Sequence, residues 1–218
     1  MGAFTGATHF FNISLEKAAR NLGYAEDNIL ILTGDIETLQ RDYPNTYENI
    51  LSCAHHADNR TPMAYAQDLV ASWLIEDSIL SALNQNGLTA KLDGADNNRQ
   101  ILSSSKTSTS SDFLVSYNGK TRKLELMNDY TGFWSRSGKL HLRDNKYQNM
   151  IKEQSLFLAV SMTTKEFALF DFEDSINATY ISAHRPYGYK PAYELSIPSS
   201  IMQHADSKTI VDAIKQHI

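Results

Sequence analysis

Apolar positions at helical spacing characterise the first part of the chain. The stretch SLEKAARNLG has a serine before its first apolar residue and a glycine after its last, which is typical of a capped helix. A second helix is predicted to begin near Pro44. The longest pattern, MAYAQDLVASWLIEDSILSALNQNG, repeats apolar residues every three or four positions and stops at Gly87. We therefore expect a helical N-terminal part over residues 1–65, followed by a long helix.

Beyond Gly87 the spacing changes to the alternation that is typical of strands. TAKLDGA alternates, and DFLVSYNGKTRKLELMND contains two runs joined through Asn118-Gly119, a hairpin signal. LRDNKYQNMIKEQ predicts a helix, and SLFLAVSMTTKEFALFDFED predicts two strands, the first apolar enough to be central. ATYISAH and AYELSI predict further strands, and SKTIVDAIKQHI a closing helix. The pattern indicates an α/β fold, a central mixed β-sheet flanked by helices.

The composition is that of an ordinary globular protein. A chain of 218 residues can form one domain, and we expect a single domain over residues 1–218. No apolar run is long enough to span a bilayer, and the first residues lack the pattern of a signal peptide. Cys53 is the only cysteine, which excludes intrachain disulfides and cysteine-based zinc sites. We expect an intracellular protein that acts in the cytoplasm of a bacterium or archaeon, without a membrane partner.

Charge is distributed unevenly along the chain. The net charge is −5, yet residues 113–152 carry 8 Lys and Arg against 3 Asp and Glu, whereas residues 1–112 carry 7 against 14. A local positive surface on a mildly acidic protein can still bind phosphate, because the field at the contact matters more than the total. The alternative is that these lysines and arginines are scattered over a solvated surface.

Two carboxylates are the strongest candidates for chemistry. Asp112 opens one strand of the predicted hairpin and Glu125 lies in the other, so antiparallel pairing brings them within a few ångströms. Two carboxylates at that distance repel each other, and a divalent cation between them relieves the repulsion. Magnesium held in this way polarises a phosphodiester and activates water. The alternative is that both residues are exposed strand ends.

The segment that holds these carboxylates resembles the motif of the PD-(D/E)XK nuclease superfamily, and specifically of type II restriction endonucleases. Ser111-Asp112 stands at the (P)D position, and residues 125–127, Glu-Leu-Met, stand at (D/E)-X-K. The long helix, which carries Glu76, and the strand TAKLDGA precede them in the family's order. The resemblance implies a restriction-endonuclease-like core over residues 66–172 and C-terminal strands and a helix over residues 173–218.

The resemblance implies a Mg²⁺-dependent, homodimeric endonuclease that cuts double-stranded DNA at a short specific sequence. Asp112, Glu125 and the carbonyl of Leu126 would hold the metal, Glu76 would be an outer carboxylate, and Lys123 would supply the positive charge near the nucleophile. Basic residues on and before the predicted helix would contact DNA phosphates, namely Arg136, Lys139, Arg143 and Lys146. Residues of polar loops would contact the bases, namely Lys106, Asn59, Arg60, Arg185 and Lys190.

Met127 departs from the motif, because it occupies the position of the family's lysine. A thioether is neutral and cannot stabilise charge on a phosphate. Three explanations are open: Lys123 or Lys146 supplies the charge, the methionine is an engineered replacement, or the protein kept DNA binding and lost catalysis. The alternatives to a restriction enzyme are therefore a non-catalytic DNA-binding protein on a nuclease scaffold, and a repair or structure-specific nuclease of the same fold.

Overall fold

The computed structural model describes residues 13–52, 61–94, 97–101, 111–174, 176–197 and 203–218. The chain forms two compact units, residues 1–78 with 95–108 and residues 79–94 with 109–218. The single domain with divisions at residues 65 and 172 stays a prediction. No helix among the described residues is both long and apolar enough to cross a membrane.

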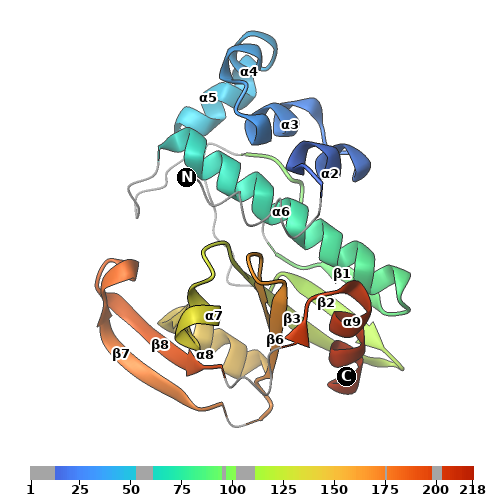
Figure 1. Ribbon diagram of the computed structural model, residues 1–218, viewed down its shortest axis with the longest axis vertical. Coiled ribbons are helices and arrows are strands. Elements are labelled where there is room, and N and C mark those ends of the chain that lie inside the picture. Colours follow the sequence, from blue (N-terminus) through green and yellow to red (C-terminus); the bar gives the residue numbers. More distant parts are fainter. Residues whose placement is uncertain (1–12, 53–60, 95–96, 102–110, 175, 198–202) are drawn as a thin grey trace. The chain divides into compact units, whose positions relative to one another are not determined.

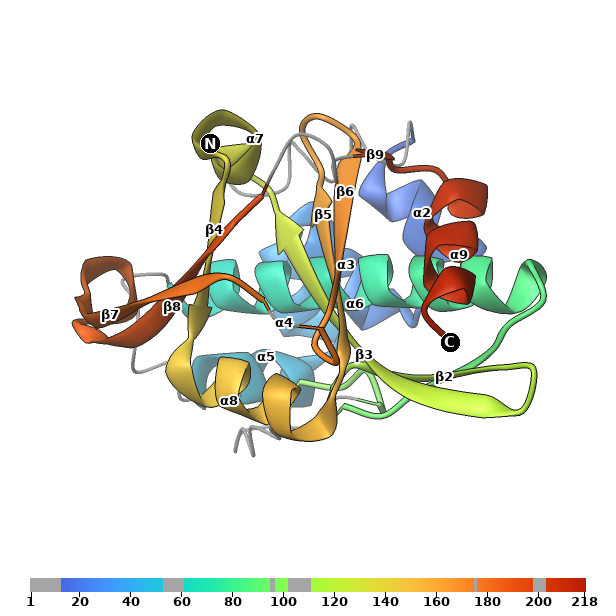
Figure 2. The same ribbon diagram turned by 90° about the horizontal axis from the view of Figure 1, so that it is seen from below.

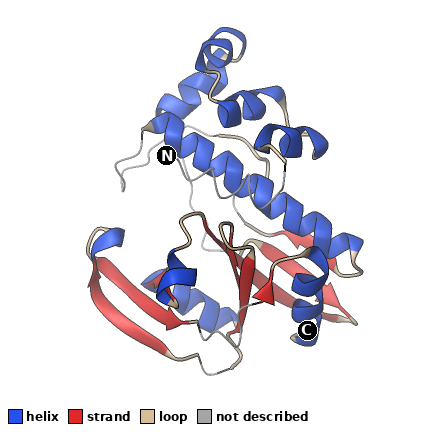
Figure 3. Cartoon of the chain, in the orientation of Figure 1, coloured by secondary structure: helices blue, strands red, loops and turns tan. Residues whose placement is uncertain are grey.

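The first unit is helical (Figures 1 and 3). Its helices are α2 (Leu15–Asn21), α3 (Glu26–Thr33), α4 (Ile36–Asp42), α5 (Pro44–Ser52) and the first part of α6 (Pro62–Gln85). The side chain of Ser14 caps α2 by accepting a hydrogen bond from Lys17 N, as the sequence predicts. Leu39, Ile50 and Trp73 meet in one buried cluster that holds α4, α5 and α6 together. In its described residues, the predicted helical N-terminal part is confirmed.

The second unit is built on a six-stranded mixed sheet in the order β1-β2-β3-β5-β6-β9. Its strands are β1 (Thr89–Leu92), β2 (Phe113–Tyr117), β3 (Lys120–Asp129), β5 (Leu156–Ser161), β6 (Glu166–Asp171) and β9 (Gln203–His204). Strands β3 and β5 are parallel and the other neighbours are antiparallel. Every residue of β5 is buried, which confirms the prediction of a central strand.

Helices cover both faces of this sheet. Tyr147 and Met150 of α8 (Asp144–Glu153) pack with Phe157 of β5 and Phe170 of β6. Helix α9 (Ser207–Gln216) buries its apolar face and contacts β6. Figures 1 and 2 show α8 and α9 on opposite sides of the sheet. The predicted α/β fold with a central mixed sheet flanked by helices is confirmed.

A second, three-stranded sheet, in the order β4-β8-β7, lies in the same unit. Strands β7 (Ala178–His184) and β8 (Lys190–Ser196) match the two predicted strands, and the short helix η1 (Arg185–Tyr187) connects them. The sequence patterns did not predict β4 (Lys139–Arg143) or the short helix α7 (Phe133–Ser137) before it. Strand β4 pairs with β8, about fifty residues later, and such a distant pairing leaves no local signal.

Candidate active site

Asp112, directly before β2, lies opposite Glu125 of β3. The hairpin pairs Phe113 with Leu124, so the next step of the register places Asp112 across from Glu125. The backbone N–H of Leu126 donates a 2.7 Å hydrogen bond to Asp112 Oδ2, which fixes this carboxylate against β3. The structure therefore brings together the two carboxylates that the sequence predicted as neighbours.

Glu125 is a buried carboxylate, with 2% of its surface exposed. Burial, together with the negative charge of Asp112, raises the pKa of Glu125 to about 8, although the charge of Lys146 opposes the shift. Leu124 and Leu126, on the opposite face of β3, are also buried, so the strand is covered on both faces. A buried carboxyl with a raised pKa beside a second carboxylate is an arrangement found at functional sites more often than in plain surfaces.

Lys146 supplies the positive charge that contacts Glu125. Its Nζ contacts Glu125 Oε1 across the space between α8 and β3. Lys123, the first candidate for this charge, instead pairs with Glu153 at 2.6 Å and lies 4.0 Å from Asp93. The role predicted for Lys123 stays a prediction, and the contacts favour Lys146, the second lysine considered from the sequence.

Met127 occupies an apolar place beside this pair. It is half-buried and packs against the cluster of buried residues that includes Trp134, Phe157 and Ala159. Ala159 of β5 is its register partner. Because a thioether suits such surroundings, the packing accounts for methionine here without a catalytic role.

Glu76 lies in the part of α6 that belongs to the first unit. Its Oε2 accepts a 2.7 Å hydrogen bond from Arg99 Nη1, and both side chains are largely buried. Arg99 also binds the neighbouring Asp77. The role of Glu76 as an outer carboxylate stays a prediction.

Basic residues that were predicted from separate parts of the sequence meet at one end of the three-stranded sheet. Strand pairing places Arg143 opposite Ala192, close to the start of β8 at Lys190. The guanidinium of Arg143 lies over the ring of Tyr187, 5.4 Å from its centre, in the segment that begins with Arg185. Burial raises the pKa of Tyr187, and the positive charges of Arg143 and Lys146 oppose the shift. Both charges therefore act on the hydroxyl of Tyr187. This basic end, Arg143, Lys146, Arg185 and Lys190, therefore adjoins the carboxylate pair through Lys146.

The other predicted DNA contacts have different surroundings. Lys139 is paired with Glu194 at 2.7 Å, and Arg136 Nη1 donates to the carbonyl of Thr131 at 2.8 Å. Lys106, Asn59 and Arg60 lie outside the described residues. Tyr187 was not identified from the sequence, because its contact with Arg143 depends on the pairing of β4 with β8.

The chemistry of this donor set fits a magnesium ion. Two carboxylates face each other, and oxygen is the ligand atom that Mg²⁺ prefers, with water completing its coordination. Among the residues that the structure describes, no group of three or more His, Cys, Asp or Glu side chains gathers as a metal site. Asp112 and Glu125 would thus hold the ion together with water. The part of the Leu126 carbonyl as a further ligand stays a prediction.

The raised pKa of Glu125 makes the stability of the metal-free protein depend on pH. The folded state holds a proton on Glu125 between its ordinary value of 4.5 and about 8, whereas the unfolded state has lost it. The free energy of unfolding should therefore fall as pH rises through this window, by on the order of 5 kcal/mol in total. In urea unfolding with a chelator present, Glu125→Gln should lack this fall, and Glu153→Gln should retain it. If the free energy of unfolding depends on pH in the same way in the wild type and in Glu125→Gln, the raised pKa of Glu125 is contradicted.

No protein-family model and no curated protein sequence matches the chain. Among solved structures, the chain is similar to a Holliday junction resolvase, Hjc, from the archaeal hyperthermophile Archaeoglobus fulgidus. The similarity covers 63% of this chain and 98% of the resolvase, with 9% identity and a TM-score of 0.36. A similarity at this level does not establish a shared activity.

Proposed function

We propose that the protein is a magnesium-dependent nuclease that hydrolyses phosphodiester bonds in DNA. The observation that carries the proposal is the buried Glu125 opposite Asp112, with Lys146 in contact with Glu125. The helix, strand, Asp112 strand and Glu125 strand follow each other in the order of the PD-(D/E)XK motif, here α6, β1, β2 and β3. Fold order together with a carboxylate pair of which Glu125 is buried supports nuclease chemistry more strongly than the short motif does alone.

Lys146 takes the part of the missing motif lysine in this proposal. It reaches Glu125 from α8, a helix that follows β3 in the chain, whereas the motif lysine would stand at position 127 of β3 itself. An ammonium group at this place can orient the attacking water and stabilise charge that develops on the phosphate. The bound ion would supply the rest of the charge, and the proton on Glu125 would leave as the ion binds.

The basic end of the second unit supports DNA as the substrate. Arg143, Arg185 and Lys190 are exposed, so each can bind a backbone phosphate. They lie near the start of α8, whose N-terminal backbone dipole adds to the attraction for an anion. Lys139 contributes less to the binding of phosphate in this proposal, because Glu194 already neutralises its charge.

The finer proposal is a homodimeric type II restriction enzyme that cuts a short two-fold symmetric sequence in double-stranded DNA. A second candidate, a structure-specific nuclease, uses the same carboxylate pair and differs only in the DNA that it selects. The third candidate is a DNA-binding protein without catalysis, which Met127 favours and the intact Asp112 and Glu125 oppose.

Cleavage assays with millimolar Mg²⁺ test the proposal. The chain as it stands should convert unmethylated phage DNA into discrete bands if it is a restriction enzyme. Cutting confined to a four-way junction would select the structure-specific candidate. Lys146→Met should reduce the cleavage rate about 10²-fold or more, since it removes a charge that stabilises the transition state.

Two further variants separate the explanations of Met127. Lys123→Met should cleave at nearly the wild-type rate if Lys146 supplies the charge. If Met127→Lys cleaves DNA and the wild type does not, the wild-type site lacks only the lysine of the motif. If neither the wild type nor Met127→Lys cleaves DNA but both bind it, the nuclease proposal is overturned and the DNA-binding protein without catalysis remains.

A further inference from the structure

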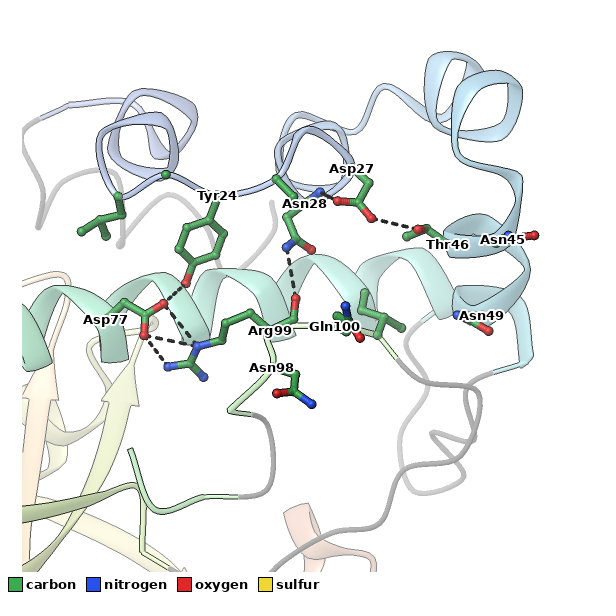
Figure 4. A pocket seen from close by; sticks show the side chains of 14 residues that line it. Tyr24, Asp27, Asn28, Asn45, Thr46, Asn49, Asp77, Asn98, Arg99 and Gln100 are labelled. Carbon is green, nitrogen blue, oxygen red and sulfur yellow. Dashed lines mark hydrogen bonds and ion pairs between the residues drawn. The ribbon is translucent and has the colours of Figure 1, made fainter. Parts of the chain in front are cut away.

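A pocket in the first unit has features of a binding site. Its volume is about 520 Å³, within the range of small-molecule sites. The lining comes from four segments, the turn after α2, the start of α3, the start of α5, and residues 98–101, with Asp77 of α6. Figure 4 shows these segments around the pocket, with the polar side chains that line it.

Carboxamide groups dominate the polar lining. They belong to Asn28, Asn45, Asn49, Asn98 and Gln100. Asn28 is 7% exposed; its Nδ2 donates to the carbonyl of Arg99 at 3.2 Å, and no described residue donates to its Oδ1. The other four carboxamides make no hydrogen bond to any described residue. Each therefore offers both a donor and an acceptor to a ligand.

The charges around the pocket are already satisfied. Arg99, the only cation among the described residues of the lining, gives Nη2 and Nε to Asp77 and Nη1 to Glu76. Asp27 accepts hydrogen bonds from Asn28 N and from the hydroxyl of Thr46. The walls thus present no unpaired positive charge, so they disfavour a phosphate and suit an uncharged polar ligand.

The Tyr24–Asp77–Arg99 network joins the turn after α2 and residues 98–101 to α6. Tyr24 donates a 2.5 Å hydrogen bond to Asp77 Oδ2, and Arg99 lies over the ring of Trp73. Burial, with the bond to Asp77, raises the pKa of Tyr24 and keeps this donor protonated. Leu22 and Ile101 add apolar surface to the lining. A flat ring can pack on such surface while its edge meets the carboxamides.

We propose that this pocket binds a purine nucleobase of the adenine type. The planar donor–acceptor edge of an Asn or Gln carboxamide matches the N6 amino group and N7 of adenine. The base can come from a free nucleoside or from an extrahelical nucleotide of DNA, and the recognising chemistry is the same. The proposal goes beyond the nuclease function and does not depend on it.

Binding of adenosine and of ribose to the full chain, measured by calorimetry, tests the base directly. Adenosine should bind and ribose should not. Asn49→Ala and Asn45→Ala should each weaken adenosine binding about tenfold, the loss of one good base contact. Gln40→Ala, which removes an exposed carboxamide of α4 outside the pocket, should leave binding unchanged.

A duplex in which 2-aminopurine stands next to an adenine distinguishes the two sources of the base, because 2-aminopurine fluoresces more strongly when the neighbouring adenine leaves the stack. A rise in its fluorescence on binding, lost in Asn49→Ala, would assign the pocket to an extrahelical base in DNA. Adenosine binding that depends on Asn49, without that rise, would assign it to a free nucleoside. The proposal is overturned if ribose binds as well as adenosine, or if neither the calorimetric nor the fluorescence response depends on Asn49. Cleavage is not a readout here, so failure of the nuclease proposal would be seen separately.

Discussion

Asp112→Asn and Glu125→Gln are each expected to lower the rate of DNA cleavage by at least about 10³-fold. Either change leaves the shape of the side chain nearly intact but removes a charge that would hold the metal ion. In Asp112→Asn the new amide also faces the N–H of Leu126, which donates 2.7 Å to the native carboxylate. Single-turnover cleavage with saturating Mg²⁺ measures the effect on chemistry apart from binding.

Glu153→Gln is the matched control for these two variants. Glu153 is a partly buried carboxylate on α8 that pairs with Lys123, and it does not contact Glu125 in the structure. Its loss should change the cleavage rate by less than about tenfold. Equal losses of activity in all three variants would mean that the negative charge of this region, and not the Asp112–Glu125 pair, is required.

Arg122→Met is expected to cause the largest loss of stability, about 3–5 kcal/mol in urea unfolding. The guanidinium of Arg122 is 11% exposed and binds Asp171 at 2.7 Å, the carbonyl of Gln154 at 2.6 Å and that of His217 at 3.0 Å. It thus ties β3 to β6, to the end of α8 and to the residue after α9. Burial favours a raised pKa for Asp171, but the hydrogen bonds from Arg122 and its neighbours outweigh burial and lower it. Removing Arg122 leaves this carboxylate buried without its cation.

Two variants control this prediction. Arg185→Met removes an exposed guanidinium of the same unit and should change the free energy of unfolding by less than about 0.5 kcal/mol. Arg122→Met combined with Asp171→Leu should recover part of the loss, because no uncompensated charge is then buried. A double variant as unstable as the sum of the two single changes would contradict the coupling.

The hairpin that carries the candidate site could be predicted from sequence because its signals are local. Asn118 and Gly119 adopt φ of 49° and 82°, as the tight turn between two strands requires. The turn fixes the register, and the register places Asp112 opposite Glu125. The fully apolar run of β5 likewise predicted its central position.

Features that depend on distant contacts could not be predicted. Lys146 and Lys123 were both plausible partners for Glu125, and the choice depends on how α8 packs over β3. The proximity of Arg143 to Tyr187 requires the pairing of β4 with β8. The carboxamide pocket combines four segments, none of which has a recognisable motif. Local patterns carry no information on such packing.

Titration of Mg²⁺ into the protein by calorimetry, in two buffers of different ionisation enthalpy near pH 7, tests the central claim most directly. Because the pKa of Glu125 is about 8, this carboxyl is mostly protonated at that pH and must lose its proton when the ion binds. We expect binding of Mg²⁺ with release of about one proton, and loss of both signals in Glu125→Gln. Mg²⁺ binding that is equally strong in Glu125→Gln, or that releases no proton, would contradict a metal site at Asp112 and Glu125.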